Sequence, residues 1–283
     1  MEAQNKTKQE GMQKIDLRKI MADKNPKLPK LLPNFLIRYL ERIIHVEELN
    51  AFIEANNDKF GLDFVEAALD NFGVNVHVHG RENIPEDGRF IFASNHPLGG
   101  IDGMALMLVV GRKRNDVLFP VNDLLMNIPN LKMLFIPINK HGSNAENARI
   151  IDDTFAGDKT MLYFPAGLCS RKQQGQIVDL EWHKTFVSKA RRHKRNVVPV
   201  YIEGRNSNFF YTLANLRTRL GIKANIEMLF LVDEMFKQKN KDIVITFGEP
   251  IPYTYFDKSK KDKQWAVEIK KRVYALGHRT VTE

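Results

Sequence analysis

A histidine and an aspartate that follow an apolar segment are the side chains best suited to chemistry in this chain. His96 comes directly after Asn95, at the end of the apolar residues 90–93, and Asp102 follows two adjacent glycines. A carboxylate that binds one imidazole nitrogen fixes the tautomer, so that the other nitrogen can take a proton from a hydroxyl group. The pair therefore predicts a general base that activates a substrate hydroxyl without a nucleophilic side chain.

Each of these two residues also has a structural interpretation. Asp102 stands where a helix is expected to begin, and aspartate is a good N-cap because its carboxylate accepts unpaired backbone N–H groups. Many loop histidines are hydrogen-bonded structural residues, so position alone favours neither role for His96.

Other groups of reactive side chains are weaker candidates. His77 and His79 share one strand face, but no third metal ligand lies near them in sequence, so no metal site is expected. Ser94 lies close to His96, yet the chain has no G-x-S-x-G motif of a serine hydrolase. The basic residues within 189–195 lack interleaved aromatic side chains for nucleic acid, and they fit a solvated helix end or a surface for an anionic carrier or lipid.

Composition limits the class of protein. The chain has 283 residues, 43% of them hydrophobic, which is enough for a buried core, and its formal net charge is +9. That charge is compatible with an anionic partner, such as a membrane surface. A single cysteine, Cys169, excludes an intramolecular disulfide. The N-terminus lacks the apolar region of a secretory signal, and no apolar run approaches the roughly 20 residues of a membrane-spanning helix.

The segments around His96 and Asp102 alternate between short apolar runs and longer helical patterns. This alternation is typical of an α/β domain with one mixed sheet flanked by helices. The apolar runs predict strands at residues 74–78, 90–93, 117–120, 135–138, 161–164, 197–202 and 243–247. The helical patterns predict helices at residues 102–110, 145–155, 182–192, 224–238 and 261–275.

The N-terminal part of the chain differs from the rest in its composition and in its hydrophobic pattern. Residues 1–30 are rich in polar and basic side chains and predict a flexible basic leader. Residues 31–73 predict an amphipathic helical extension, because apolar residues recur at helical spacing after Pro33 and a second such pattern stops at Gly73. The extension is expected to cover the main domain, residues 74–283, with insertion into a membrane interface as the alternative.

The segment around His96 resembles the N-H-x-x-x-x-D motif of the glycerolipid and lysophospholipid acyltransferases, the relatives of 1-acylglycerol-3-phosphate acyltransferase. Three further blocks of that superfamily have counterparts in the same order: FIPINK at residues 135–140, FPAGLCSR at 164–171 and VPV at 198–200. Four ordered blocks are far more specific than one histidine and one aspartate. The resemblance implies that residues 74–283 form an acyltransferase domain.

Differences from the common motifs narrow the expected substrate. Five residues separate His96 from Asp102 where the family has four, and the two intervening glycines are expected to absorb the extra residue. Ala166 replaces the usual glutamate. Lys140 replaces an arginine and Cys169 stands where an arginine often sits, which weakens the bidentate grip on a phosphate monoester. The sequence motif N-H-P-L-G-G-x-D-G is similar to that of the hemolysin-like branch, which includes O-acyltransferases of ornithine and glycine lipids.

The resemblance implies an enzyme that moves a fatty acyl group from acyl carrier protein or coenzyme A to the hydroxyl of a lyso-lipid, preferably an N-acyl amino acid. The alternatives are a 1-acylglycerol-3-phosphate O-acyltransferase and a non-catalytic lipid-binding protein on the same scaffold. His96 and Asp102 are the implied catalytic residues, with no cofactor and a peripheral position on the cytoplasmic face of a membrane. The residues implied to bind substrate are Asn95, Lys140, Phe164, Pro165, Gly167, Ser170 and Arg171.

Overall fold

A computed structural model of the chain describes residues 14–121, 125–137 and 144–279, and its centre is one seven-stranded sheet. The strands of this sheet are β1 (Asn75–His79), β2 (Phe90–Ser94), β3 (Val117–Val121), β4 (Phe135–Pro137), β5 (Thr160–Tyr163), β8 (Asn196–Ile202) and β9 (Asp242–Phe247). Their order is β1-β9-β8-β2-β5-β3-β4. Neighbours are parallel except β8 and β9, which are antiparallel, so the sheet is mixed as predicted.

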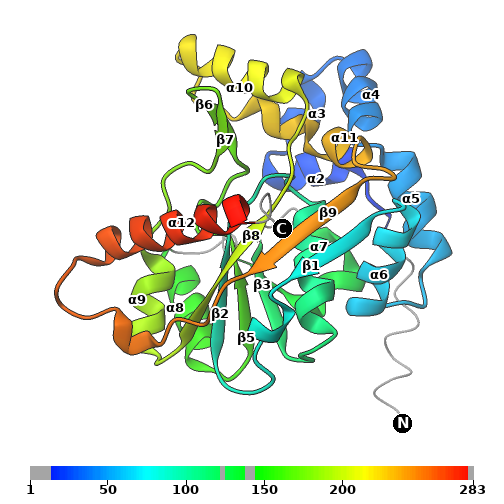
Figure 1. Ribbon diagram of the computed structural model, residues 1–283. Helices are drawn as coiled ribbons and strands as arrows, with labels where there is room; N and C mark the ends of the chain where they lie inside the picture. The colour runs from blue at the N-terminus through cyan, green and yellow to red at the C-terminus, as the bar shows by residue number, and fades with distance from the viewer. Residues whose placement is uncertain (1–13, 122–124, 138–143, 280–283) are drawn as a thin grey trace.

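Helices cover both faces of the sheet and one of its ends. They are α2 (Leu17–Lys24), α3 (Leu28–Leu31), α4 (Asn34–Ile43), α5 (Val46–Ala55), α6 (Leu62–Asn71), α7 (Ile101–Gly111), α8 (Asn144–Ala156), α9 (Thr185–Arg192), α10 (Asn208–Arg219), α11 (Leu231–Phe236) and α12 (Asp262–Arg279). Shorter 3-10 turns are η1 (Arg81–Asn83), η2 (Leu125–Asn127), η3 (Pro129–Leu134), η4 (Ile226–Phe230) and η5 (Tyr253–Tyr255). Figure 1 shows α6 and α7 on one side of the sheet, α8, α9 and α12 on the other, and α3, α4, α10 and α11 gathered at one end.

Two apolar cores lie on opposite faces of the sheet because side chains alternate along each strand. In β2, Phe92 packs into a core that includes Leu106 of α7, whereas its neighbour Ile91 packs into a core that includes Phe186 of α9. All five residues of β2 are buried. The strand that leads to His96 is therefore the fixed centre of the molecule.

The seven predicted strands all occur, and their ends agree within one residue. Residue 138, at the end of one predicted strand, lies outside the described residues. The single helix predicted at 224–238 is wrong, because η4 and α11 divide this segment. Helix α9 begins at Thr185 rather than at Trp182, whose indole is buried and donates from Nε1 to Asp179 Oδ2 at 2.8 Å. Helix α5 lies within the helical extension predicted at residues 31–73, but helix α10 and the hairpin of β6 (Arg171–Gln173) and β7 (Gln176–Val178) were not predicted.

The described part of the expected leader contains helix. Asp16 caps α2, since its carboxylate accepts the Lys19 N–H at 3.0 Å, and Met21 of α2 is buried. Helix α6 ends as predicted, with Gly73 at a φ of +60°, where an added Cβ would lie 2.3 Å from Asn240 Oδ1. The boundaries at residues 30 and 73 remain predictions. Within the described ranges, the longest and most apolar helices still fall short of what crossing a membrane requires.

Candidate active site

His96 and Asp102 are in direct contact at the end of β2. The Nδ1 atom of His96 lies 2.9 Å from Asp102 Oδ2. The same oxygen accepts the Leu98 N–H at 2.8 Å, and Asp102 Oδ1 accepts the Gly103 N–H at 2.9 Å. The Asp102 side chain is fully buried, whereas 14% of the His96 side chain is exposed. The carboxylate is therefore held in place from several sides, and the imidazole is the member of the pair that a substrate can reach.

A left-handed glycine accommodates the extra residue between His96 and Asp102. Gly99 has a φ of +89°, and an added Cβ would lie 2.7 Å from Leu231 Cδ2 and 3.0 Å from Cys169 Sγ. The left-handed conformation is strained for a residue with a Cβ, so it favours glycine at this position. Gly100 is the N-cap of α7, and Asp102 is the second residue of the helix. The interpretation of Asp102 as the N-cap is therefore wrong.

The electrostatics of the pair follow from its burial. Burial lowers the pKa of His96, but the charge of Asp102 and the nearby Cys169 outweigh it, so the pKa lies well above its ordinary value. Burial raises the pKa of Asp102, yet His96 and the backbone N–H groups of Leu98 and Gly103 bring it below the ordinary value. Asp102 therefore stays ionised and holds the proton on Nδ1, which leaves Nε2 to exchange a proton with a substrate.

Phe164, expected to bind substrate, contacts the imidazole itself. Its ring stacks on His96 with centroids 3.9 Å apart and planes inclined by 19°. Phe119 of β3 packs edge-on against Phe164 at 5.1 Å. Because β2, β3 and β5 run parallel, their carboxyl ends bring these three rings to one edge of the sheet. The stack fixes the plane of the imidazole and gives it an apolar neighbour.

Asn95 joins β2 to β8. Its Nδ2 donates to the Ile202 carbonyl at 2.8 Å, and its Oδ1 accepts the Ile202 N–H at 2.7 Å. The side chain is buried, and backbone groups engage both its donor and its acceptor atom. The geometry favours a positioning role for Asn95, which fixes the strand end from which His96 projects, over the predicted contact with substrate.

The segment after Phe164 makes a tight turn beside the pair. Gly167 has a φ of +66°, its N–H donates to the Phe164 carbonyl at 3.0 Å, and an added Cβ would meet nothing within 4 Å. Pro165 is buried, and its carbonyl accepts the His183 N–H at 3.0 Å. The turn therefore presents open space at Gly167, where a substrate could approach the backbone closely.

Ser170 and His96 share a buried carboxylate that the sequence did not reveal. Asp179 Oδ1 accepts from Ser170 Oγ at 2.6 Å and from the His96 N–H at 3.2 Å. The Ser170 N–H donates in turn to the His96 carbonyl at 2.7 Å. Asp179 follows the short strand β7, and a lone aspartate within the apolar sequence IVDLEW was the one available signal. It ties the His96 loop to the block of residues 164–171.

Arg171 is engaged by the protein. Its guanidinium donates to Glu227 Oε1 and to the Cys169 carbonyl, both at 2.6 Å, and it lies over the ring of Phe210. Glu227 is fully buried and also binds Arg217 at 2.6 Å. Removing one partner of a buried ion pair typically costs about 3–5 kcal/mol. This arrangement favours a structural role for Arg171 over the predicted contact with substrate.

The other basic residues that the sequence suggested for binding differ in their burial and in their partners. Lys140, expected to bind the acceptor, lies outside the described residues. Arg195 cannot face an anionic partner, because its side chain is fully buried and donates to the carbonyls of Phe155 at 2.6 Å and Lys159 at 2.7 Å. Lys189 pairs with Asp152 at 2.5 Å. The proposed basic surface is therefore smaller than the run of charges in the sequence suggests.

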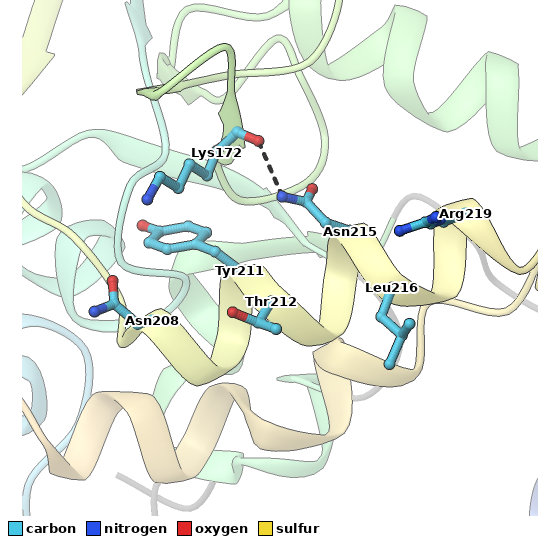
Figure 2. A pocket seen from close by; sticks show the side chains of 7 residues that line it. All are labelled: Lys172, Asn208, Tyr211, Thr212, Asn215, Leu216 and Arg219. Atoms are coloured by element: carbon cyan, nitrogen blue, oxygen red, sulfur yellow. Dashed lines mark hydrogen bonds between the residues drawn. The ribbon is translucent and has the colours of Figure 1, made fainter.

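Two surface hollows are lined by none of the predicted site residues. One of about 600 Å³ lies along α10 and next to β6, where the Asn215 amide donates to the Lys172 carbonyl at 3.4 Å (Figure 2). Another of about 450 Å³ is strongly basic and is lined by Lys184, Arg191, Lys258, Lys260, Lys261, Asp262 and Lys263. The chemistry at His96 thus stands on the side-chain constellation rather than on either hollow.

Comparisons with known proteins identify relatives of this chain. A family model described as Acyltransferase matches residues 19–280. A lyso-glycine lipid O-acyltransferase of Bacteroides thetaiotaomicron is 50% identical over 264 residues, which cover 93% of this chain and 97% of that protein. A lyso-glycine lipid O-acyltransferase of Phocaeicola vulgatus is 49% identical, over 93% of this chain and 95% of its own length.

A solved structure is also similar. The 1-acyl-sn-glycerophosphate (LPA) acyltransferase PlsC of Thermotoga maritima covers 76% of this chain and 81% of its own, with 18% identity and a TM-score of 0.45. The family model and the two relatives confirm the resemblance found in the four sequence blocks. The chain belongs to the acyltransferase family.

Proposed function

We propose that this acyltransferase moves a fatty acyl group from a thioester to the hydroxyl of an N-acylglycine, that is, a lyso-glycine lipid. The contact between His96 and the buried Asp102 carries the proposal, because it provides an oriented base for a hydroxyl. Two relatives that match almost their whole length bear the name of this activity, which supports the choice of acceptor.

The proposed reaction uses no covalent enzyme intermediate. Nε2 of His96 takes the proton of the acceptor hydroxyl, and the oxygen attacks the thioester carbonyl carbon to form a tetrahedral oxyanion. The C–S bond then breaks, and the imidazolium returns the proton to the departing thiolate. Asp102 balances the positive charge of the imidazolium. Since the N–H groups of Gly99 and Gly167 already donate to Asp102 and Phe164, Gly100 is the preferred backbone candidate for the oxyanion.

A phosphate-bearing acceptor has less support. The guanidinium of Arg171 is bound to Glu227 and to a backbone carbonyl, so it is not available for a bidentate contact with a phosphate monoester. A carboxylate and a secondary amide make smaller demands on positive charge. This observation favours the N-acyl amino acid over 1-acylglycerol 3-phosphate.

The acyl donor in this proposal is acyl carrier protein or coenzyme A. Both are anionic, and six of the seven side chains that line the hollow around Lys184 and Lys258 are basic. Arg191, Lys260 and Lys263 pair with the carboxylates of Asp262, Glu268 and Glu181, which leaves Lys184, Lys258 and Lys261 as the main candidates for an anionic carrier. Each carrier leaves as a thiol that takes its proton from His96, so either carrier fits the mechanism.

The proposed place of work is the cytoplasmic face of a membrane, where thioester donors and lyso-lipids meet. Figure 1 shows α4 and α10 at one end of the molecule. Large apolar side chains of these elements and of η4 are exposed, with exposed fractions of 75% for Phe35 of α4, 65% for Leu220 after α10 and 46% for Leu229 of η4. Helix α4 contacts η4, and η4 contacts α10, so these side chains come from neighbouring elements. Arg38 and Arg219 lie nearby in sequence and suit anionic headgroups.

The double variant Phe35→Glu with Leu220→Glu is expected to weaken binding to anionic vesicles by at least about tenfold, because each substitution removes the insertion of a large apolar side chain. Co-sedimentation with phosphatidylglycerol-containing vesicles measures the change. Val267→Glu is the matched control, since Val267 of α12 is an exposed apolar side chain too, with an exposed fraction of 43%. Unchanged sedimentation of the double variant would reject this membrane surface.

The choice of acceptor predicts a preference between two lipids. With one acyl thioester, the purified protein is expected to acylate an N-(hydroxyacyl)glycine with a kcat/KM on the order of 100-fold above that for lysophosphatidic acid. Thiol release gives the rate, and mass spectrometry identifies the product. Phosphatidic acid as the main product would transfer the assignment to the glycerophosphate acceptor, and no acylation of either lipid would remove the proposed function.

A further inference from the structure

Asn206 is a buried side chain whose polar atoms lack hydrogen-bond partners in the described ranges. It is 2% exposed, and neither its Oδ1 nor its Nδ2 has a hydrogen-bond partner among the described residues. Asn95 and Asn130, which are buried to a similar degree, both donate to backbone carbonyls. A buried amide without partners costs stability, so its persistence needs an explanation, such as a ligand that supplies the partners.

The loop that carries Asn206 lies beside the His96 loop. It leaves β8 at Ile202, the residue that Asn95 binds through two hydrogen bonds. Two residues further on, an added Cβ at Gly204 would lie 2.8 Å from Leu98, which belongs to the segment between His96 and Asp102. The parallel pairing of β2 with β8 places both loops at the same edge of the sheet.

The same loop is held rigidly. The Asn206 N–H donates to the Tyr211 hydroxyl at 2.9 Å, and Ser207 donates to Glu234 from its backbone at 2.5 Å and from its hydroxyl at 2.6 Å. Tyr211 packs in a cluster with Cys169, the residue that approaches Gly99 of the His96 loop. Asn206 is therefore held on a rigid loop that borders the His96 loop, and neither polar atom of its carboxamide has a partner in the described part of the chain.

We propose that Asn206 binds the secondary amide of the acceptor, an inference that rests on the proposed function. A carboxamide presents one acceptor oxygen and an NH₂ donor. The amide of an N-acyl amino acid presents one N–H and one C=O, which are the complements of Oδ1 and Nδ2. An ester linkage in the same position lacks the N–H, so Asn206 distinguishes an amide-linked acceptor from an ester-linked one.

The test compares two acceptors that differ in one group: an N-(hydroxyacyl)glycine and its analogue in which an ester oxygen replaces the amide N–H. The wild type is expected to prefer the amide by about tenfold or more in kcat/KM, as the loss of a partner for a buried polar atom implies. Asn206→Leu removes both polar atoms at similar volume and is expected to bring this ratio close to one. Asn208→Leu, a substitution of an exposed asparagine on the same segment, is the matched control and is expected to keep the wild-type ratio.

Thermal melting gives a second measurement that needs no substrate. Because the leucine replaces an unpartnered buried amide, Asn206→Leu is expected to raise Tm by roughly 2–4 °C, so that loss of the amide preference cannot come from unfolding. A wild-type amide-to-ester ratio in folded Asn206→Leu, or equal rates of the wild type on both acceptors, would overturn the inference alone. A wild type that acylates neither acceptor would overturn the proposed function and this inference with it.

Discussion

Replacement of His96 by alanine is expected to lower kcat for acyl transfer by about 10²–10⁴-fold, the usual contribution of a general base. The imidazole is the proposed proton acceptor; Asp102 lies 2.9 Å from its Nδ1 atom, and the Phe164 ring stacks on it with centroids 3.9 Å apart. Alanine leaves the hydroxyl of the acceptor without a base, while water can fill the space. The rate is measured as thiol released from the acyl thioester at saturating acceptor.

A second histidine bound to an aspartate provides the matched control for this prediction. His193 Nε2 lies 2.8 Å from Asp152 Oδ1, and the hydrogen bonds of Lys189 and His193 lower the pKa of Asp152 to about 2. His193→Ala breaks a pair of the same kind away from the proposed site, so its kcat is expected to stay within about twofold of the wild type. Equal losses in the two variants, or near-normal activity of His96→Ala, would exclude His96 as the base.

Asp102→Asn is expected to lower kcat/KM by about 10³–10⁴-fold with the fold intact. A carboxylate accepts the Nδ1–H of His96 as well as the N–H groups of Leu98 and Gly103, whereas a carboxamide has one acceptor oxygen for these three donors. The imidazole then loses its fixed tautomer and the charge that balances its protonated form. Melting curves separate this loss of catalysis from a loss of stability.

The pH dependence of the same variant has a predicted direction. His96 must be neutral to act as a base, and Asp102 keeps the pKa of His96 above its ordinary value. The kcat/KM of the wild type therefore rises as pH increases through that raised pKa and levels off above it. Without the negative charge the pKa falls, so the residual activity of Asp102→Asn is expected to reach its plateau at a lower pH. A plateau that moves to higher pH, or does not move, would contradict the ion pair as the cause.

The sheet could be predicted from the sequence because its strands are short apolar runs with clear ends. β2 is buried on both faces and consists of FIFAS, a run that has few alternatives to a central strand. Helix α10 was missed, since exposed Phe209, Leu216 and Leu220 interrupt the division into an apolar and a polar face. The hairpin of β6 and β7 was missed because its first strand is RKQ, which has no apolar pattern.

The site divides in the same way between local and distant information. His96 and Asp102 lie in one motif, so their contact could be inferred from the sequence. Asp179 is 83 residues from His96, and Glu227 is 56 residues from Arg171, so only the tertiary structure shows which partner each residue finds. Arg171 is an example. A basic residue in a binding motif suggests an anionic ligand, but in the structure its guanidinium binds the buried carboxylate of Glu227, which is distant in sequence.

The pairing of β1 with β9 has a consequence for how the chain is made. β1 lies at the edge of the sheet, and its Asn75 faces Asp242, a residue 167 positions later. During synthesis this strand leaves the ribosome long before its partner exists, and loop closure over such a distance is slow. Until β9 has been synthesised, the partly formed sheet has an unpaired strand edge, and nascent chains in such a state aggregate or bind chaperones. We therefore expect folding to finish only after translation nears its end, and premature stop codons before residue 242 to yield no partly active fragment.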